Sequence, residues 1–476
     1  MLFHSLEYGI FLILTFVGFW ALSRRRLLRV VFLLLASWVF YAASNPWFLT
    51  LILASTITDY ISGRVMGHKD EGTPERTRRL CLIVSLAVNL GLLGVFKYTN
   101  FFYESAVDVA NLAGLDWVYH RVNILLPAGI SFYTFQTMSY SIDVYRGRLA
   151  PERSLLRFAL FVGFFPQLVA GPIVRAVDFI PQITRRAYLT RAQASRAAWL
   201  IGVGLFKKVV IADFLAVNLV DRVFMAPERF SSLEVLVGLY GYTMQVYMDF
   251  SAYSDIAIGS ALLFGFHLPD NFDRPYMATS IQDFWRRWHK TLGSWLRDYL
   301  YYPLGGSRGS DVRTYFNLLV TFVLIGLWHG ADWTFVVYGC CHAAAMCTHR
   351  FFRVNVNARA TPTLNVWGWV WRVMLTLHFI VFTRILFRCQ DFGQVGDVLV
   401  ALGQGSFHLG HLTSGLLWLL LGTFVVHWAP RRYVNGLRDR LEALPAFVQG
   451  PIFAIALLLI MQASSSEVVP FIYFQF

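Results

Sequence analysis

Long apolar runs alternate with short basic segments along the chain, and this pattern restricts the fold more than any other feature. Most runs have about 15–25 residues, enough for a membrane-spanning helix at a rise of ~1.5 Å per residue. Only 14% of the residues are charged, whereas a soluble domain carries roughly 25%, so several soluble cores could not be coated. We therefore expect an all-α, multi-pass integral membrane protein that forms one continuous domain over residues 1–476. The runs lie near residues 8–22, 30–43, 47–63, 80–96, 122–144, 198–223, 233–264, 315–329, 333–348, 366–387, 413–428 and 450–463.

The net charge of +13 has two possible origins, a nucleic-acid-binding surface or membrane topology. The basic residues gather in short clusters between apolar runs, for example at 24–26, 76–79, 185–186 and 431–432. Such clusters mark cytoplasmic loops under the positive-inside rule. We therefore expect no nucleic-acid partner. The cluster at 24–26 follows the first apolar run, whereas a cleavable signal peptide has its positive charges before that run, so we expect a retained first helix.

Two stretches do not fit simple spanning helices. Residues 158–174 are apolar but have arginines at both ends and contain two glycines and two prolines. This composition indicates a re-entrant segment, which is tolerated only where protein or a cavity surrounds it. Residues 276–313 are basic, with interleaved aromatic residues, and indicate an interfacial segment on the cytoplasmic surface.

His329 is the sharpest candidate for chemistry, in the sequence Gly326-Leu327-Trp328-His329-Gly330. The preceding helix leaves the basic side at Arg313, and sixteen residues give ~24 Å of travel, past the bilayer centre. The next helix returns to basic residues at Arg350 and Arg353. His329 is therefore expected at the turn of a helical hairpin, as a functional residue or as an imidazole hydrogen-bonded at the membrane interface.

Other polar residues in or beside apolar runs give weaker signals. His289, in the basic segment, could mark the cytoplasmic end of a passage whose other end is His329, or could lie on the surface of an interfacial helix. Asp249, Ser254 and Asp255 could orient a histidine or hold substrate. Alternatively, the two carboxylates cap a broken helix or pair with a basic residue, because a buried carboxylate must be paired, hydrogen-bonded or protonated.

Several familiar motifs are missing from the sequence. There is no G-x-x-x-x-G-K-[ST] phosphate loop, no G-x-G-x-x-G after a strand, and no G-x-S-x-G nucleophile turn. There is also no H-E-x-x-H and no His/Cys cluster with metal-ligand spacing, and the five cysteines form no disulfide framework. We therefore expect no bound metal or cofactor.

A series of motifs in order along nearly the whole chain resembles the membrane-bound O-acyltransferases. The similarity is to the bacterial branch that contains the alginate O-acetylation membrane protein and its peptidoglycan and teichoic-acid relatives. The alginate protein has the motif Phe-Ser-Gly-Tyr-Ser-Asp, and the corresponding residues of this chain are Phe-Ser-Ala-Tyr-Ser-Asp. The matching stretches are 96–102, 126–136, 165–172, 249–255, 284–289, 296–301, 326–330 and 470–476.

The resemblance implies a bowl-shaped domain of about 11–13 transmembrane helices with additional re-entrant and interfacial helices. A donor tunnel from the cytoplasm would meet an outer funnel near His329. His289 matches a second frequently noted histidine of the family. A neutral imidazole is the natural base for a hydroxyl that attacks a thioester, so His329 is expected to be that base. Trp328 is expected to contact substrate, and the basic residues Arg286, Arg287, Lys207 and Lys208 to contact the phosphates of the donor.

The expected function is transfer of an acetyl group from a cytoplasmic thioester, acetyl-CoA or an acyl carrier, to hydroxyls of an envelope polysaccharide such as alginate. The expected location is the bacterial inner membrane, among lipids, and a periplasmic acetyltransferase partner would reach the polymer. Two alternatives remain open. One is acylation of teichoic acid or of a lipid. The other is a secondary transporter, motivated by the intramembrane carboxylates, although no internal repeat supports it.

Overall fold

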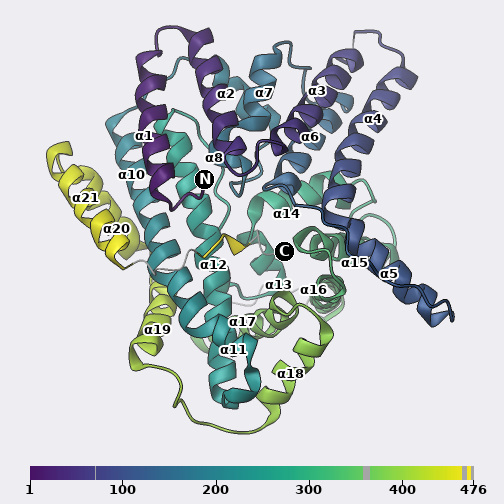
Figure 1. Ribbon diagram of the computed structural model, residues 1–476, viewed down its shortest axis with the longest axis vertical. Coiled ribbons are helices and arrows are strands. Elements are labelled where there is room, and N and C mark those ends of the chain that lie inside the picture. The colour runs from purple at the N-terminus through teal and green to yellow at the C-terminus, as the bar shows by residue number, and fades with distance from the viewer. Residues whose placement is uncertain (70, 357–364, 464–468, 473–476) are drawn as a thin grey trace. The chain divides into compact units, whose positions relative to one another are not determined.

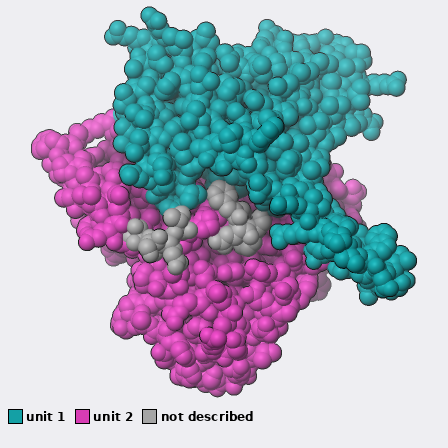
Figure 2. Space-filling model, viewed as in Figure 1, with its two compact units in different colours: residues 1–190, 260–269 teal, residues 191–259, 270–476 magenta. Residues whose placement is uncertain are grey.

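The computed structural model describes residues 1–69, 71–356, 365–463 and 469–472. Within these ranges helices are the only regular secondary structure, which confirms the all-α prediction (Figure 1). Residues 473–476 of the carboxy-terminal motif lie outside the described ranges. The helices form two compact units, residues 1–190 with 260–269, and residues 191–259 with 270–476 (Figure 2). The two are described separately below.

Among the described residues, three helical stretches are long and apolar enough to cross a membrane by length and composition: Glu75–Leu112, Asp311–His329 and Val366–Arg388. Four shorter apolar helices of 10–17 residues accompany them. Most predicted runs coincide with observed helices, but the run predicted at 122–144 begins as a helix only at Ile130, after the Pro127 and Gly129 turn. The count of 11–13 spanning helices stays a prediction.

Unit 1 consists mainly of the helices in the amino-terminal part of the chain. Its elements are α1 (Leu6–Ala21), α2 (Arg26–Ala42), α3 (Phe48–Met66), α4 (Glu75–Leu93), the π-helical turn η1 (Gly94–Tyr98), α5 (Thr99–Leu112), α6 (Ile130–Tyr145), α7 (Leu155–Gly163), α8 (Phe165–Leu168) and α9 (Ala176–Thr184).

Buried polar side chains connect α3, α4 and α6. The Asp59 carboxylate of α3 accepts hydrogen bonds from Ser85 and Asn89 of α4, the latter at 2.8 Å, and from Ser141 of α6 at 2.9 Å. Arg78 of α4 donates to the final carbonyl groups of α3 and α6 at 2.8–3.2 Å. Helix ends leave such carbonyls without an intrahelical partner, so this one guanidinium fastens two helix ends to a third helix.

The predicted irregular stretch at 158–174 is indeed a broken, buried helix. α7 ends at Gly163, and α8 is a single turn that begins at Phe165. The Phe165 N–H donates to the Ser37 hydroxyl at 3.2 Å, and the Gln167 amide donates to the Phe161 carbonyl at 2.6 Å. These bonds satisfy backbone groups that the break would otherwise leave open. Its re-entrant position in a bilayer stays a prediction.

Unit 2 holds the helices that carry the candidate residues. Its elements are α10 (Arg191–Leu205), η2 (Phe206–Asp213), η3 (Ala216–Val220), α11 (Asp221–Met225), η4 (Pro227–Arg229), α12 (Ser232–Leu263, with its last four residues assigned to unit 1), η5 (Pro275–Met277), α13 (Ile281–Arg287), α14 (Lys290–Leu296), η6 (Arg297–Tyr301), α15 (Asp311–His329), α16 (Trp333–Phe351), η7 (Phe352–Val356), α17 (Val366–Arg388), α18 (Phe392–Gly403), α19 (Ser414–Trp428), α20 (Arg431–Ala443) and α21 (Ala446–Gln462).

The helical hairpin predicted around His329 is confirmed as α15 and α16. Its two helices approach closely at glycines: a Cβ on Gly326 would lie 2.1 Å from the Phe335 carbonyl oxygen. A Cβ on Gly339 would lie 2.5 Å from the Phe322 carbonyl oxygen. Only glycine permits this backbone contact. Asp332 caps α16 by accepting a hydrogen bond from the Thr334 N–H at 2.8 Å, so the turn has a fixed geometry.

Candidate active site

His329 is the last residue of α15 and is 2% exposed. Aromatic rings from three helices surround its imidazole. The ring of Trp328 on α15 lies 5.0 Å away between centroids, and that of Phe387 on α17 lies 5.2 Å away, both edge-on. Tyr338 of α16 is perpendicular at 6.4 Å. The expected position at the hairpin turn is thus confirmed, and the imidazole is enclosed by protein rather than by lipid.

His289 lies between α13 and α14 and is 1% exposed, so the surface position considered for it is wrong. Its backbone adopts φ 43°, a left-handed conformation that a non-glycine residue holds only when its surroundings enforce it. Its Nδ1 accepts the Leu292 N–H at 3.4 Å and caps α14. Burial lowers the pKa of His289 to about 3, so its imidazole is neutral at physiological pH. With Nδ1 as acceptor, the proton of the neutral ring resides on Nε2.

Trp328 connects the two histidines. Its ring centroid lies 5.5 Å from that of His289 and 5.0 Å from that of His329, with both imidazoles edge-on. Phe250 of α12 packs on the other side of His289 at 4.8 Å. The structure therefore brings together three of the predicted site residues, contributed by the α13–α14 segment and by α15.

Arg384 of α17 is a site neighbour that the sequence reading missed. Its guanidinium is 1% exposed and stacks over Trp288 at 4.7 Å and over Phe387 at 5.0 Å. Trp288 precedes His289 in the chain, and Phe387 packs on His329, so this cation lies near both imidazoles. An arginine inside the apolar run 366–387 was the available signal, because charge within such a run is costly and marks function by default.

The predicted carboxylates have basic partners. Lys208 is 1% exposed, and its Nζ lies 3.0 Å from Asp249 and 2.7 Å from Asp213. The other Asp249 oxygen accepts the Ile472 N–H at 2.8 Å. Asp255 pairs with Lys207 at 2.6 Å. The geometry thus fits the alternative in which these carboxylates pair with basic residues, and roles for Asp249, Asp255, Lys207 and Lys208 in substrate binding stay predictions.

Ser254 is connected to the His289 segment. Its hydroxyl accepts a hydrogen bond from the Asn271 amide at 3.3 Å. The Asn271 side-chain oxygen in turn accepts the Thr291 hydroxyl at 2.9 Å and the Thr291 N–H at 3.3 Å. This chain ties α12 to the first turn of α14, so Ser254 helps to position His289.

A pocket of ≈ 600 Å³ opens within unit 2 beside these residues. Part of its wall is apolar and includes Phe322 and Ile325 of α15, and no acidic residue is among the described residues that line it. Ile325 precedes His329 by four residues, ~6 Å along the helix. Arg287 is not among the lining residues and instead pairs with Asp283 at 2.9 Å. The basic lining residues are Arg286, Lys290, Arg297, Arg350 and Arg353.

A row of aromatic contacts leads from the pocket wall to His329. Trp285 lines the pocket, and its Nε1 donates to Nδ1 of His342 at 3.2 Å. The His342 ring lies 4.4 Å from that of Tyr338, which in turn faces His329. Along this path three side chains, Trp285, His342 and Tyr338, separate a ligand in the pocket from the buried imidazole.

The family model for "MBOAT, membrane-bound O-acyltransferase family" matches residues 48–389. This range includes all the side chains of the candidate site described above, and only the backbone contacts of residues 469–472 lie outside it. The chain belongs to this family. It is therefore a multi-pass membrane acyltransferase, as the sequence motifs predicted.

Named relatives sharpen the comparison. The chain is 39% identical over 428 residues to a probable alginate O-acetylase of Pseudomonas aeruginosa, covering 90% of this chain and 80% of the relative. It is 35% identical to a peptidoglycan O-acetyltransferase of Helicobacter pylori, covering 85% and 80%. A teichoic acid D-alanyltransferase of Bacillus subtilis is 28% identical over 57% of this chain and 70% of its own length.

Proposed function

We propose that this membrane O-acyltransferase transfers an acetyl group from a cytoplasmic thioester to hydroxyls of an envelope polysaccharide such as alginate, with His329 as the general base. The observation that carries the proposal is the buried His289–Trp328–His329 cluster next to a basic pocket that reaches Ile325 on the same helix as His329. This arrangement offers a base and a donor site within one unit.

The chemical step follows from the reactants. The acceptor hydroxyl attacks the thioester carbonyl carbon, and His329 takes the hydroxyl proton as the C–O bond forms. Collapse of the tetrahedral intermediate breaks the C–S bond, and the leaving thiolate receives the proton back from His329. The enclosing rings of Trp328, Tyr338 and Phe387 keep bulk water from the thioester, which would otherwise hydrolyse.

His289 has a different role in this proposal. A group with a pKa of about 3 is a very weak base at physiological pH. A neutral ring with its proton on Nε2 is instead a fixed hydrogen-bond donor, suited to the developing oxyanion of the thioester carbonyl. Trp328 orients both imidazoles and contacts the acyl group.

The donor binds in the basic pocket. Two of its five cations, Arg297 and Arg350, also pair with Asp298 and Asp311 at 2.9 Å. The cationic lining as a whole matches the phosphates of CoA or of a phosphopantetheine carrier. Arg350 and Arg353 follow the α15–α16 hairpin and belong to a basic cluster. Under the positive-inside rule such a cluster supports a pocket mouth on the cytoplasmic side. Arg286 lines the pocket and contacts the phosphates directly. Arg287 makes no direct contact and affects donor binding only through its ion pair with Asp283.

The acceptor side rests on the relatives. Their names include alginate and peptidoglycan acetylation, which supports an acetyl group and a glycan acceptor. A periplasmic acetyltransferase partner would carry the group to the polymer. The lower similarity to a teichoic acid D-alanyltransferase keeps acylation of teichoic acid as the second candidate, together with a lipid acceptor. Family membership counts against the transporter hypothesis.

The test measures the acetyl content of the polymer in cells that depend on this chain for acetylation. His329→Ala should lower the acetyl content to background while the protein stays in the membrane. A matched control is His120→Ala, because His120 is an exposed loop residue. Unchanged acetyl content in the His329→Ala cells would overturn the proposal. If the unmodified chain acylates only teichoic acid or lipid, the second candidate function replaces the proposed acetylation of a glycan.

A further inference from the structure

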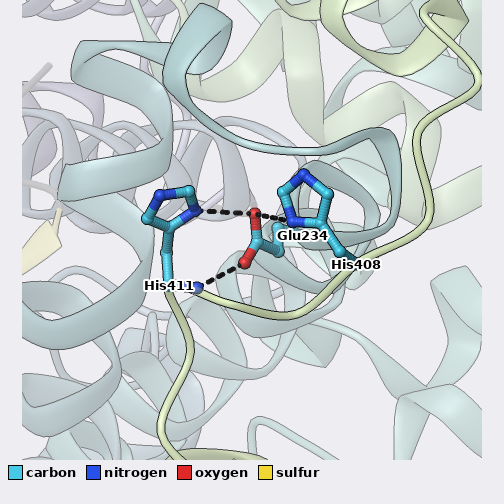
Figure 3. A group of neighbouring side chains, drawn as sticks. All are labelled: Glu234, His408 and His411. Carbon is cyan, nitrogen blue, oxygen red and sulfur yellow. Dashed lines mark hydrogen bonds and ion pairs between the residues drawn. The ribbon is translucent and has the colours of Figure 1, made fainter.

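A second group of chemically capable side chains lies in unit 2 and includes neither active-site histidine. Glu234 in the first turn of α12 meets His408 and His411 from the loop between α18 and α19 (Figure 3). One ligand atom from each residue lies within 4.8 Å of the others. In Figure 3 the two imidazole rings flank the carboxylate from opposite sides.

The loop is fastened to α12 independently of these side chains. The Ser232 hydroxyl accepts the Gly405 N–H at 3.0 Å and donates to the Ala401 carbonyl at 2.9 Å. The Leu233 N–H donates to the Ser406 carbonyl at 3.2 Å. The three side chains are therefore held close to one another by the fold before any ligand arrives, which lowers the cost of ordering them.

The Glu234 carboxylate is also fixed. It is 0% exposed and accepts the backbone N–H groups of Ser231 at 2.9 Å and His411 at 2.7 Å. The two histidine side chains, in contrast, are 60% and 51% exposed. A buried anion between two solvent-facing imidazoles forms a half-open site.

The separations between these side chains can be compared with those around a bound cation. Nδ1 of His411 lies 3.1 Å from Oε2 of Glu234, within hydrogen-bond distance. Nδ1 of His408 approaches the same oxygen at 3.8 Å, too far for a hydrogen bond. Ligand atoms around a tetrahedral Zn²⁺ with bonds of 2.0–2.2 Å lie roughly 3.3 Å apart. A cation between the three atoms would account for the convergence of His408.

We propose that Glu234, His408 and His411 bind a divalent transition-metal ion of the zinc class. Two imidazole nitrogens and one carboxylate oxygen are a ligand set that zinc accepts with its fourth position open, whereas Ca²⁺ and Mg²⁺ prefer oxygen ligands alone. The exposed imidazoles leave that fourth position to water or to an anionic group from outside. The bound ion joins the α18–α19 loop to the start of α12.

The positive-inside rule predicts an outer position for this site. The loop precedes α19, and α19 runs to the basic cluster at Arg431 and Arg432, which marks the cytoplasmic side. The sequence predicted no metal site because its ligands lie far apart in the chain. Glu234 and His411, for example, are separated by 177 positions. Only the fold makes the cluster. The proposal is independent of the acyl-transfer reaction.

The test uses the full-length protein in detergent, stripped with a chelator and titrated with ZnCl₂ alone. We expect one Zn²⁺ per chain and a higher midpoint of thermal unfolding in its presence. His408→Ala leaves the Glu234–His411 contact in place, so it should fold. Because loss of an outer partner of a metal ligand costs 10–100-fold in affinity, loss of a ligand should cost at least about 100-fold.

Two further variants make the outcome decisive. His408→Cys supplies another zinc ligand and should restore binding, whereas His120→Ala should bind as the unmodified chain does. Substoichiometric binding by the unmodified chain would overturn the proposal. So would unchanged zinc affinity in His408→Ala, or equal binding of Mg²⁺ and Zn²⁺.

Discussion

Two buried clusters in unit 2 contain ionisable side chains, and their surroundings differ. In the Lys208 cluster each charge faces an opposite charge: the Nζ lies between Asp213 and Asp249 at 2.7 and 3.0 Å. In the histidine cluster the rings of His289 and His329 pack edge-on against Trp328. Charge compensation holds segments together in the first cluster, whereas aromatic side chains surround the imidazoles in the second. Burial alone therefore does not identify a catalytic residue.

The Lys208 cluster also shows how the end of the chain is held. Lys208 donates to the Val469 carbonyl at 3.0 Å, and Asp249 accepts the Ile472 N–H. Phe471 is 0% exposed and packs on Tyr253 at 4.1 Å between ring centroids. The cluster thus links η2, α12 and the segment 469–472, which is a structural task.

The largest effect on stability should come from Lys208→Met. Removing one partner of a buried ion pair typically costs about 3–5 kcal/mol, because the remaining charges are left uncompensated. We expect most of the protein to be lost from the membrane or to unfold at a much lower temperature. Lys207→Met is the matched control, since the Lys207–Asp255 pair is about one fifth exposed and should cost about 1 kcal/mol or less. Equal stability of the two variants would contradict the structural role of the Lys208 cluster.

His289→Gln should lower the rate of transfer by about 10–100-fold, because loss of one oxyanion donor costs on the order of 10²-fold and the glutamine amide replaces part of it. The Michaelis constant for the donor should change little. A normal rate in this variant, measured per folded molecule, would mean that His289 only caps α14.

The same variant gives a pH test. The pKa of His289 is lowered to about 3 by burial, while the unfolded chain has a value near 6.5. Because the unfolded state binds more protons below pH 6.5, the His289 contribution to stability is complete above that pH and is lost progressively toward pH 3. The unfolding midpoint of the unmodified protein should therefore fall more steeply between pH 7 and pH 4 than that of His289→Gln. Parallel curves would contradict the buried neutral state.

The smallest effect concerns the donor pocket. Arg286→Gln should raise the Michaelis constant for acetyl-CoA about 3–10-fold through loss of about 1 kcal/mol of phosphate attraction, with the turnover number unchanged. Arg287→Gln should have a smaller effect because Arg287 is paired with Asp283 and does not line the pocket. Arg308→Gln, an exposed charge outside the lining, controls for net charge. A larger increase of the Michaelis constant in Arg287→Gln than in Arg286→Gln would contradict donor binding in this pocket.

The helical hairpin around His329 could be predicted from the local sequence. The runs predicted at 315–329 and 333–348 are observed as Asp311–His329 and Trp333–Phe351, because the glycines and the Asp332 cap act over a few residues. α20 was missed because it is short and highly charged, so no apolar run marks it.

Long-range contacts account for what the sequence could not predict. Nothing local indicates that His289 is buried against Trp328, or that Lys208 lies beside Asp249 and the segment 469–472. The site residues were identified one by one from their chemistry and from family motifs. Their division into an ion-paired cluster and a pair of histidines enclosed by aromatic rings required the fold.

The central claim is that the aromatic-enclosed imidazole performs the chemistry while the ion-paired cluster holds the fold. The most direct measurement is the rate of acetyl transfer per folded molecule in purified His329→Gln. We predict a thermal midpoint close to that of the unmodified protein and a rate lowered about 10²–10⁴-fold, the usual contribution of a general base. A rate within a factor of a few of the unmodified protein, at equal folded fraction, would contradict the account.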